Sequence, residues 1–297
     1  MFTVKVPATS ANLGPGFDTL GLALELFLQV DVELSNYSSE IYWQGEGKDT
    51  IGDQIDNNLL ITAMKKVFRE AGLDIPLPSL IIRNEIPIGK GLGSSAAAIT
   101  AGMFAANRIL AGRFSQKTLL KWAVEMEGHA DNIVPAFYGG LTISMIHEDE
   151  VFFQKINFPK GIQLVIAVPD FEMPTEKSRQ LLPQNIALQD MVANLQRACF
   201  LLASLANGDV RDINRAMDDL IFQPVRQKNI PGFKQVLENA MQAGALGVAI
   251  SGSGPSLIAF AREKDNVGQV MQKAFLQNGI ESRIFQLNAC EQGVKLV

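Results

Sequence analysis

Residues 86–97, with the sequence IPIGKGLGSSAA, constrain the fold of this chain more than any other stretch. An apolar segment typical of a β-strand, 80–86, leads into them, and a segment rich in small residues and typical of a helix, 96–110, follows. Glycines at 89, 91 and 93 allow tight turns and let a ligand approach the backbone closely. The sequence therefore predicts a strand–loop–helix unit whose helix begins near Ser94.

The start of that helix suits a phosphate group. Unpaired N–H groups and the positive end of the helix dipole would face the loop. Ser94 and Ser95 add hydroxyls for a phosphate oxygen or a metal ion, and Lys90 adds a positive charge. The loop is not a Walker loop, because no Gly-Lys-Ser/Thr follows the last glycine. A glycine-rich turn with Ser94 as an ordinary N-cap would explain the same pattern.

Composition indicates a globular protein with little attraction for polyanions. The 297 residues, 47% hydrophobic, suffice for one large domain or two ordinary ones. Basic and acidic residues number 26 and 31, so the net charge of −5 gives no general pull toward nucleic acid or anionic membrane. A nucleoside triphosphate would have to be held locally by backbone amides, a few cations and a metal ion.

The cysteines and the N-terminus favour a cytoplasmic protein. Cys199 and Cys290 are far apart and form no CxxC pair, which argues against a disulfide framework or a thiolate metal cluster. The first six residues alternate like a strand and do not resemble a secretory signal. Charged and polar residues interrupt the longest apolar stretches, so we expect no membrane-spanning helix.

Strands and helices are mixed along the chain without strict alternation, which predicts an α+β fold. An irregular loop is expected over 7–19. We predict two domains, 1–158 and 159–297, with a boundary near 155–161 and a cleft between them. The expected strands are 2–6, 20–34, 80–86, 141–146, 151–153, 162–168, 246–251, 257–261 and 283–287, and the expected helices are 57–71, 96–110, 115–127, 266–277 and stretches up to 243.

Two further stretches combine glycine with polar residues. Residues 6–18, VPATSANLGPGFD, follow the first strand, and Asn12 and Asp18 are the polar groups that such a rigid loop could aim into a cleft. Alone, they are equally well explained as turn-forming residues. Residues 247–258, GVAISGSGPSLI, place a glycine-serine turn between two apolar strands, which a plain hairpin would also explain.

These three stretches resemble the motifs of the GHMP kinases, in the family's order. Residues 86–97 are similar to the phosphate-binding signature, 6–18 to the first motif of the homoserine kinases within the family, and 247–258 to the third motif. The resemblance covers essentially the full length. It implies a two-domain fold, ribosomal protein S5 domain 2-like at the N-terminus and ferredoxin-like at the C-terminus. It also implies nucleotide contacts at Pro87, Ile88, Gly89, Lys90, Gly91, Leu92, Gly93, Ser94, Ser95, Ala96 and Ala97.

The resemblance further implies ATP- and Mg²⁺-dependent phosphorylation of L-homoserine to O-phospho-L-homoserine, a step of threonine biosynthesis. Phosphoryl transfer needs a cation to neutralise developing charge. By this resemblance Glu127 is the magnesium carboxylate, assisted by the Ser94 hydroxyl, with Glu125 as the open alternative. Asn57, Asn58 and Leu59 are candidate adenine contacts, although Asp56 could instead be an ordinary helix N-cap.

A dedicated general base is not expected. Sugar and mevalonate kinases of the family place an aspartate near position 132 and a lysine near position 9, whereas this chain has Asn132 and Thr9. In a loose transition state the attacking hydroxyl keeps its proton until late, so positioning and charge stabilisation supply most of the rate. We predict direct in-line transfer with Asn12 and Asn132 as positioners, and Asp131 and His129 as the alternative bases.

Homoserine carries an ammonium and a carboxylate, so its pocket needs groups of both charges. The resemblance implies that Asn12 meets the reacting end of the substrate and Asp18 the ammonium. It implies that Thr175, Arg179 and Arg226 line the carboxylate end. Either arginine could instead be an ordinary surface residue.

Three other functions fit parts of the pattern. They are a GHMP-type kinase of another small hydroxylated metabolite, a non-catalytic nucleotide sensor, and a nucleic-acid-binding regulator. A sensor would be expected to lack the metal carboxylate or the glycine loop, and the acidic balance argues against the regulator. The resemblance also implies a homodimer.

Overall fold

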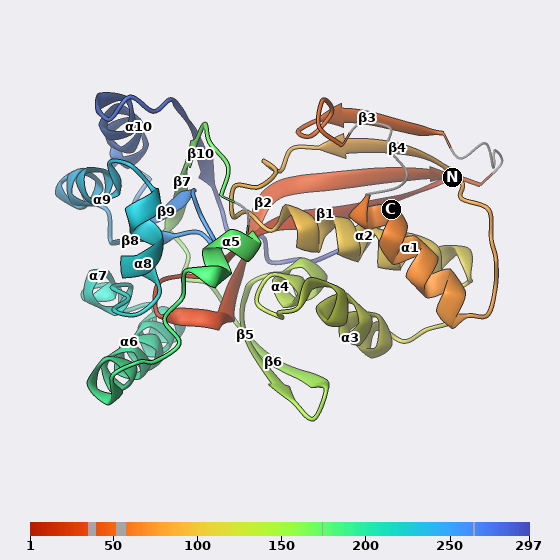
Figure 1. Ribbon diagram of the computed structural model, residues 1–297, viewed down its shortest axis with the longest axis horizontal. Helices are drawn as coiled ribbons and strands as arrows, with labels where there is room; N and C mark the ends of the chain where they lie inside the picture. The colour runs from red at the N-terminus through yellow and green to blue at the C-terminus, as the bar shows by residue number, and fades with distance from the viewer. Residues whose placement is uncertain (35–39, 52–57, 174, 264) are drawn as a thin grey trace.

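The computed structural model describes residues 1–34, 40–51, 58–173, 175–263 and 265–297, without the side chains of Thr175 and Glu176 (Figure 1). Two groups of strands lie side by side, each covered by helices, and the chain passes from one to the other between Ile156 and Gln163.

The first sheet is built on two long antiparallel strands, which pair along most of their length. In the second of them, buried residues alternate with more exposed ones from Leu24 to Val30, as expected of a strand with one covered face. The sheet order is β11-β1-β2-β4-β3, with β5 pairing β2 and β6. The strands are β1 (Phe2–Asn12), β2 (Gly16–Glu33), β3 (Ile41–Gly45), β4 (Ser79–Asn84), β5 (Leu141–His147), β6 (Glu150–Ile156) and β11 (Lys295–Leu296).

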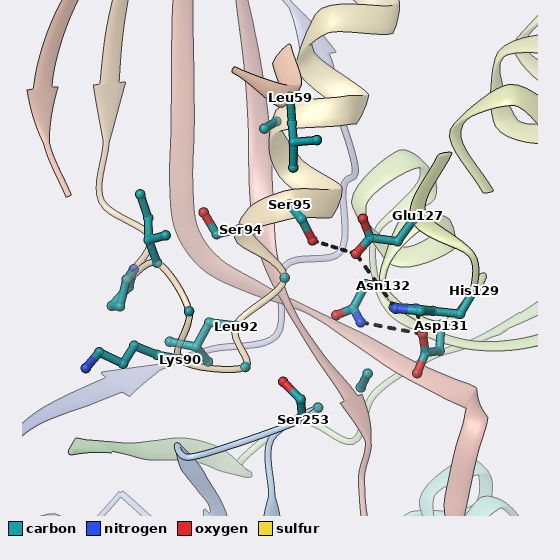
Figure 2. Close-up of a pocket in the computed structure, with 18 of the residues that line it drawn as sticks. Leu59, Lys90, Leu92, Ser94, Ser95, Glu127, His129, Asp131, Asn132 and Ser253 are labelled. Atoms are coloured by element: carbon teal, nitrogen blue, oxygen red, sulfur yellow. Dashed lines mark hydrogen bonds and ion pairs between the residues drawn. The ribbon is translucent and has the colours of Figure 1, made fainter. Parts of the chain in front are cut away.

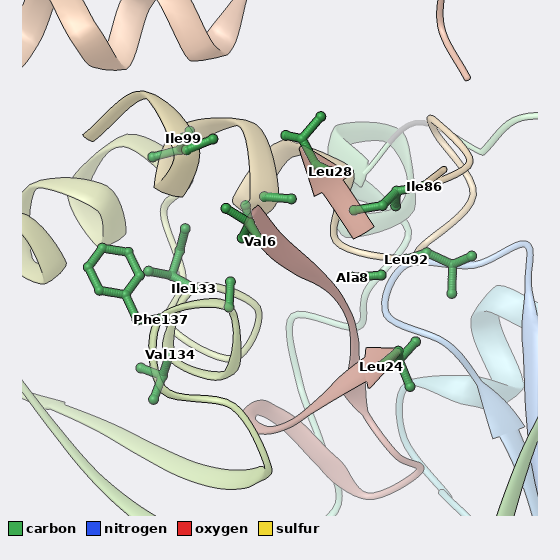
Figure 3. Close-up of a cluster of buried hydrophobic side chains, with 14 of the residues drawn as sticks. Val6, Ala8, Leu24, Leu28, Ile86, Leu92, Ile99, Ile133, Val134 and Phe137 are labelled. Carbon is green, nitrogen blue, oxygen red and sulfur yellow. The ribbon is translucent and has the colours of Figure 1, made fainter. Parts of the chain in front are cut away.

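Helices α1 (Leu59–Glu70), α2 (Ser94–Ile109), α3 (Gln116–Glu127) and α4 (Ile133–Tyr138) cover one face of this sheet. The small residues of α2 let α1 pack closely, and an added Cβ at Gly102 would collide with the carbonyl oxygen of Leu60. Figure 3 shows Val6, Ile99 and Phe137 in the core that joins β1, α2 and α4. This packing fixes the start of α2 against the end of β1.

The loop predicted over 7–19 was wrong. β1 continues through Asn12 and β2 begins at Gly16, so residues 13–15 form the turn. Proline lacks an N–H, and the pairing register shifts between Pro7 and Ala8 before it resumes with Ala8 opposite Leu24. The proline is thus accommodated by a bulge, and the strand does not end there.

The second sheet is antiparallel with the order β10-β7-β9-β8. Along the chain its elements run strand, helices, strand, strand, helix, strand, which is the ferredoxin-like order predicted from the sequence. The strands are β7 (Gln163–Pro169), β8 (Gly247–Ile250), β9 (Leu257–Ala261) and β10 (Ser282–Leu287). The helices are α5 (Thr175–Gln180), α6 (Leu188–Asn207), α7 (Ile213–Ala216), α8 (Gln223–Arg226), the 3₁₀ turn η1 (Gln227–Asn229), α9 (Phe233–Gln242) and α10 (Val267–Gln277).

The two faces of this sheet have different partners. Val165 and Ala259 pack in a cluster with α9 and α10, whereas Ile166 and Phe260 belong to the large core shared with the first sheet. The last residues return to the first sheet, where β11 pairs with β1. The predicted division at residue 158 falls between β6 and β7 and stays a prediction. Within the described residues, no helix has both the length and the apolar character needed to cross a bilayer.

Candidate active site

A cavity of about 230 Å³ lies where the two sheets meet, and the three sequence motifs converge on it (Figure 2). One end is apolar and formed by the first sheet and α1. The other end is polar and charged, and receives Asp18 from β2, Arg179 from a helix at 175–180 and Arg226 from a helix at 223–226. The lining includes Asn12, Asp18, Pro87, Ile88, Gly89, Lys90, Gly91, Leu92, Gly93, Ser94, Ser95, Glu127, Asn132, Arg179 and Arg226. Ala96 and Ala97, predicted nucleotide contacts, are buried in α2 behind this surface.

The glycine loop has a backbone that only glycine adopts easily. Gly89, Gly91 and Gly93 have φ of 68°, 77° and 67°. Gly93 is the N-cap of α2, and within the described residues no side chain caps this helix start. The first N–H groups of α2 are therefore available to an anion in the cavity.

The first and third motifs hold this loop from opposite sides. The Thr9 N–H donates to the Leu92 carbonyl at 3.1 Å, and the Ser256 N–H donates to the Lys90 carbonyl at 3.2 Å. The Ser251 hydroxyl donates to the Gly91 carbonyl at 2.7 Å. An added Cβ at Gly91 would collide with the Ser251 carbonyl oxygen. The third motif does connect the paired strands β8 and β9, as a hairpin would, and it also supports the loop.

A buried carboxylate stands beside the helix start. Glu127 is the last residue of α3, and the Ser95 hydroxyl donates to its Oε1 at 2.5 Å. Burial raises the pKa of Glu127, and the hydrogen bond from Ser95 opposes that rise. The predicted alternative, Glu125, is exposed and lies 3.5 Å from Lys66 Nζ. Glu127 therefore lines the cavity and Glu125 does not.

The predicted partner of Glu127, Ser94, also lines the cavity, but its hydroxyl lies apart from the carboxylate (Figure 2). Consecutive helical residues point about 100° apart, so only one of two adjacent serines faces a given group. Ser95 occupies that position, which sequence reasoning did not assign. The role of Ser94 stays a prediction.

Asn132 and its neighbours form a hydrogen-bonded row behind the glycine loop. The Thr9 hydroxyl donates to Asn132 Oδ1 at 2.8 Å, and both lie against Gly93, where an added Cβ would collide with Thr9 Oγ1. His129 Nδ1 lies 2.6 Å from Asp131 Oδ1. Burial alone would lower the pKa of His129 by disfavouring the protonated imidazole. The hydrogen bond and the charge of Asp131 outweigh this effect and raise the pKa of His129.

Asn12 joins the first motif to the third. Its Nδ2 donates to the Gly252 carbonyl at 2.9 Å, and its Oδ1 accepts from the Asp18 N–H at 3.1 Å. The backbone at Asn12 is left-handed, with φ of 71°. These contacts orient the Asn12 amide at the cavity wall, and its predicted contact with the substrate stays a prediction.

The charged end of the cavity holds both predicted arginines. Arg179 forms a two-pronged ion pair with Asp18, with N–O distances of 2.5 and 3.0 Å. Arg226 is 4% exposed and donates from Nη1 to the Gly252 carbonyl at 2.8 Å, so it is not an ordinary surface residue. Burial and the charge of Arg179 lower the pKa of Arg226. The side chain of Thr175, the third predicted contact here, lies outside the described residues.

Two models of one protein family match this chain. Profiles described as GHMP kinases N terminal domain and GHMP kinases C terminal match residues 58–140 and 201–279. The chain belongs to the GHMP kinase family. These two matched regions lie in the first and second sheet systems respectively.

Relatives in the GHMP kinase family match over nearly the full length. The homoserine kinase of Carboxydothermus hydrogenoformans is 41% identical, with 99% of this chain and 96% of that protein covered. The homoserine kinase of Moorella thermoacetica is 42% identical, with 99% of both covered. The crystal structure of homoserine kinase from Cytophaga hutchinsonii matches with a TM-score of 0.84 and 32% identity. The match covers 100% of this chain and 97% of that chain. The crystal structure of L. major mevalonate kinase in complex with R-mevalonate has the same fold, with a TM-score of 0.72 and 14% identity. That match covers 97% of this chain and 96% of that chain.

Phe17, at the charged end of the cavity, was missed by sequence reasoning. The Phe17 ring stacks on Phe222 with centroids 4.0 Å apart, and the guanidinium groups of Arg179 and Arg226 lie 5.4 and 5.2 Å from its centroid. Phe17 lies in the first GHMP kinase motif beside Asp18, so its position was the available signal. Both arginines therefore lie near the same aromatic ring.

The apolar end of the cavity bears on the adenine predictions. Asn58 and Leu59 line it, whereas Asn57 and Asp56 lie outside the described residues. Asn58 is the N-cap of α1, since its Oδ1 accepts from the Leu60 N–H at 3.0 Å. Within the described residues, Asn58 Nδ2 is buried without a hydrogen-bond partner. The remaining apolar lining is Leu28, Trp43, Ile51, Ile88 and Ala98.

The oxygen donors near α2 fit a magnesium ion. Mg²⁺ in phosphoryl-transfer sites is commonly held by one or two carboxylates, with waters and phosphates completing its coordination. Glu127 supplies a carboxylate, and Ser95 and Ser94 supply hydroxyls at the same end of α2. In the described part of the chain, no cluster of three or more His, Cys, Asp or Glu side chains suits a metal. A single-carboxylate site completed by phosphates is the arrangement that these residues support.

Proposed function

We propose that this chain is a homoserine kinase, which transfers the γ-phosphoryl group of ATP to the side-chain hydroxyl of L-homoserine. The products are ADP and O-phospho-L-homoserine, an intermediate of threonine biosynthesis. One observation carries the proposal: Asp18, Arg179 and Arg226 stand at one end of the cavity that the glycine loop lines. The homoserine kinases that match over nearly the whole chain support it.

The triphosphate lies on the N–H groups at the start of α2, where the helix dipole favours negative charge. Lys90 adds a cation. Burial lowers the pKa of Lys90, while the charges of Asp170 and Glu172 oppose that change. The adenine ring occupies the apolar end between Trp43 and Leu59, where the unpartnered Asn58 amide offers a donor.

Glu127 would hold Mg²⁺ together with a serine hydroxyl from the start of α2. Bound there, the ion would neutralise charge on the phosphates during transfer. Ser95 keeps the carboxylate beside the glycine loop through its hydrogen bond. Ser94, at the same helix start, is the second hydroxyl within this part of the cavity.

The hydroxyl of the substrate is positioned without a dedicated general base. Thr9 accepts no proton in this scheme, because its hydroxyl donates to Asn132 and fixes the amide beside Gly93. The two alternative bases, His129 and Asp131, are hydrogen-bonded to each other. In-line transfer then relies on alignment of the hydroxyl by Asn132 and Asn12, with its proton lost late.

The charged groups select an amino acid. Arg179 and Arg226 receive the carboxylate, with Thr175 as their predicted neighbour, and Asp18 receives the ammonium. Paired recognition of a carboxylate by guanidinium groups is strong and directional.

ADP release, measured with L-homoserine and with a panel of other alcohols such as shikimate and mevalonate, tests the proposal. L-Homoserine should give the highest kcat/KM by at least tenfold. Preference for another alcohol would favour the alternative of a GHMP-type kinase for a different metabolite. Tight ATP binding without turnover of any alcohol would favour a nucleotide sensor.

We further propose a cytoplasmic homodimer that does not bind nucleic acid or membrane. The outward face of α6 supports pairing, because it carries an apolar stripe that includes Leu188, Leu195 and Phe200, each more than half exposed. Met191, Val192, Leu181, Ile186 and Leu220 are further exposed apolar residues of this region. A standard interface buries about 800 Å² on each partner, and apolar side chains like these supply its core. Light scattering of the protein and of Leu195→Glu tests this: the variant should be monomeric, and a monomeric parent protein would contradict it.

A further inference from the structure

The two side chains assigned to opposite ends of the substrate form an ion pair with each other. Asp18 lies at the start of β2 and Arg179 lies on α5, 161 residues later, yet they form a two-pronged ion pair. Both side chains line the cavity, and each is about one third exposed. The pair is therefore a wall of the pocket and is open to a ligand.

The surroundings leave a positive charge without an anion. The Arg226 guanidinium lies 5.2 Å from the centroid of the Phe17 ring, and the Arg179 guanidinium lies 5.4 Å from the same centroid. Its Nη1 bonds to a neutral carbonyl, and its buried Nε has no hydrogen-bond partner in the described part of the chain. Asp18 forms its ion pair with Arg179, so a second carboxylate would supply the anion that Arg226 lacks.

We propose that the Asp18–Arg179 ion pair, at the charged end of the cavity, is exchanged for two ion pairs when a zwitterion binds. The inference rests on the proposed function and adds how the site selects its substrate. A ligand carboxylate replaces Asp18 on Arg179 and also meets Arg226, and the ligand ammonium occupies the Asp18 carboxylate released in the exchange. No bond is made or broken in this step.

Selection follows from the charge balance. A zwitterion separates Asp18 from Arg179 and gives each a new partner. An alcohol that carries only a carboxylate pairs with Arg179 but leaves Asp18 unpaired. An alcohol that carries only an ammonium pairs with Asp18 but leaves Arg179 unpaired. Because an unpaired charge in a partly desolvated site is costly, each singly charged ligand must bind at least about tenfold more weakly than the zwitterion.

The test measures binding of L-homoserine and of 4-hydroxybutanoate, which lacks the ammonium, by calorimetry in the presence of a nonhydrolysable ATP analogue. In Asp18→Asn, L-homoserine should bind at least tenfold more weakly. The same substitution should tighten 4-hydroxybutanoate at least threefold, because Arg179 no longer has a competing partner. Asp209→Asn, which breaks a two-pronged ion pair with Arg211 at the protein surface, should change neither value.

The opposite arm uses Arg179→Gln and 3-aminopropan-1-ol, which lacks the carboxylate. Binding of this amino alcohol should tighten while binding of L-homoserine weakens, and this arm decides the matter where Asp18→Asn does not fold. If either variant weakens its singly charged ligand or leaves it unchanged, the exchange is refuted. Failure of the unmodified protein to bind and phosphorylate L-homoserine would instead refute the proposed function.

Discussion

The Ser95 hydroxyl donates a 2.5 Å hydrogen bond to Glu127, which ties the first turn of α2 to the last residue of α3. This contact brings a buried carboxylate next to the helix start on which a phosphate would rest. The carboxylate and the amide groups would therefore meet one ligand from two helices.

Glu127→Gln should lower kcat by roughly 100-fold or more, because a neutral amide gives up the anionic ligand for the metal. Raising the Mg²⁺ concentration should restore part of the loss. Steady-state kinetics across a Mg²⁺ series measures both effects. Glu125→Gln is the matched control and should retain normal rates, since that side chain is exposed beside Lys66. Equal losses in the two variants would contradict the assignment.

Gly91→Ala should raise the KM for ATP at least tenfold. The left-handed backbone at φ of 77° strains an alanine by about 1–3 kcal/mol, and the new Cβ would also collide with the Ser251 carbonyl. Gly112→Ala separates the two causes: its φ is 79°, but no described atom lies within 4 Å of the added Cβ. This control should lose stability without a change in KM. A normal KM for ATP in Gly91→Ala would count against the loop as the phosphate site.

Arg226→Ala should raise the KM for L-homoserine at least about 30-fold, because removing a buried charged partner costs about 2–5 kcal/mol. The KM for ATP should change little. Arg215→Ala, at an exposed arginine, is the control and should leave both constants unchanged. Initial-rate measurements with each substrate varied in turn give the comparison. An unchanged KM for L-homoserine in Arg226→Ala would remove Arg226 from the pocket.

Asp31 should make stability depend on pH. Burial works against its charge, but hydrogen bonds from Thr3, Arg83 and Gln29 lower the pKa of Asp31 below its ordinary value. A depressed carboxylate pKa stabilises the fold above the unfolded pKa of about 3.9, and this contribution is lost as the pH falls through the folded pKa.

Urea unfolding of the parent protein and of Asp31→Asn measures this contribution. At pH 7 the variant should be less stable by about 1–3 kcal/mol. Below pH 4 the difference should shrink, because the parent carboxyl becomes neutral too. A difference that stayed constant from pH 7 to pH 3 would show that Asp31 acts through packing and not through its charge.

The sequence predicted the glycine loop because its constraints are local. Positive φ at Gly89, Gly91 and Gly93 and the helix start at Ser94 are properties of the chain itself. The helix expected over 115–127 is confirmed for the same reason, since Ser115 is its N-cap and its hydroxyl accepts from the Thr118 N–H. Glu127 and the arginines came from the family resemblance, and their gathering in one cavity needed the structure.

Features that depend on distant contacts were missed. The extension of β1 beyond Pro7 requires pairing with β2 across a shifted register, which no local pattern reveals. The return of β11 to β1 joins the two ends of the chain. Phe17 gains its role only because Phe222 and two arginines, from distant segments, surround its ring.

The most direct test of the account is ³¹P NMR of the purified protein incubated with ATP, Mg²⁺ and L-homoserine. We predict a phosphomonoester signal that matches O-phospho-L-homoserine, formed in equal amount with ADP, and absent when either Mg²⁺ or L-homoserine is omitted. Release of inorganic phosphate without this product, or no consumption of ATP, would contradict the assignment of this chain as a homoserine kinase.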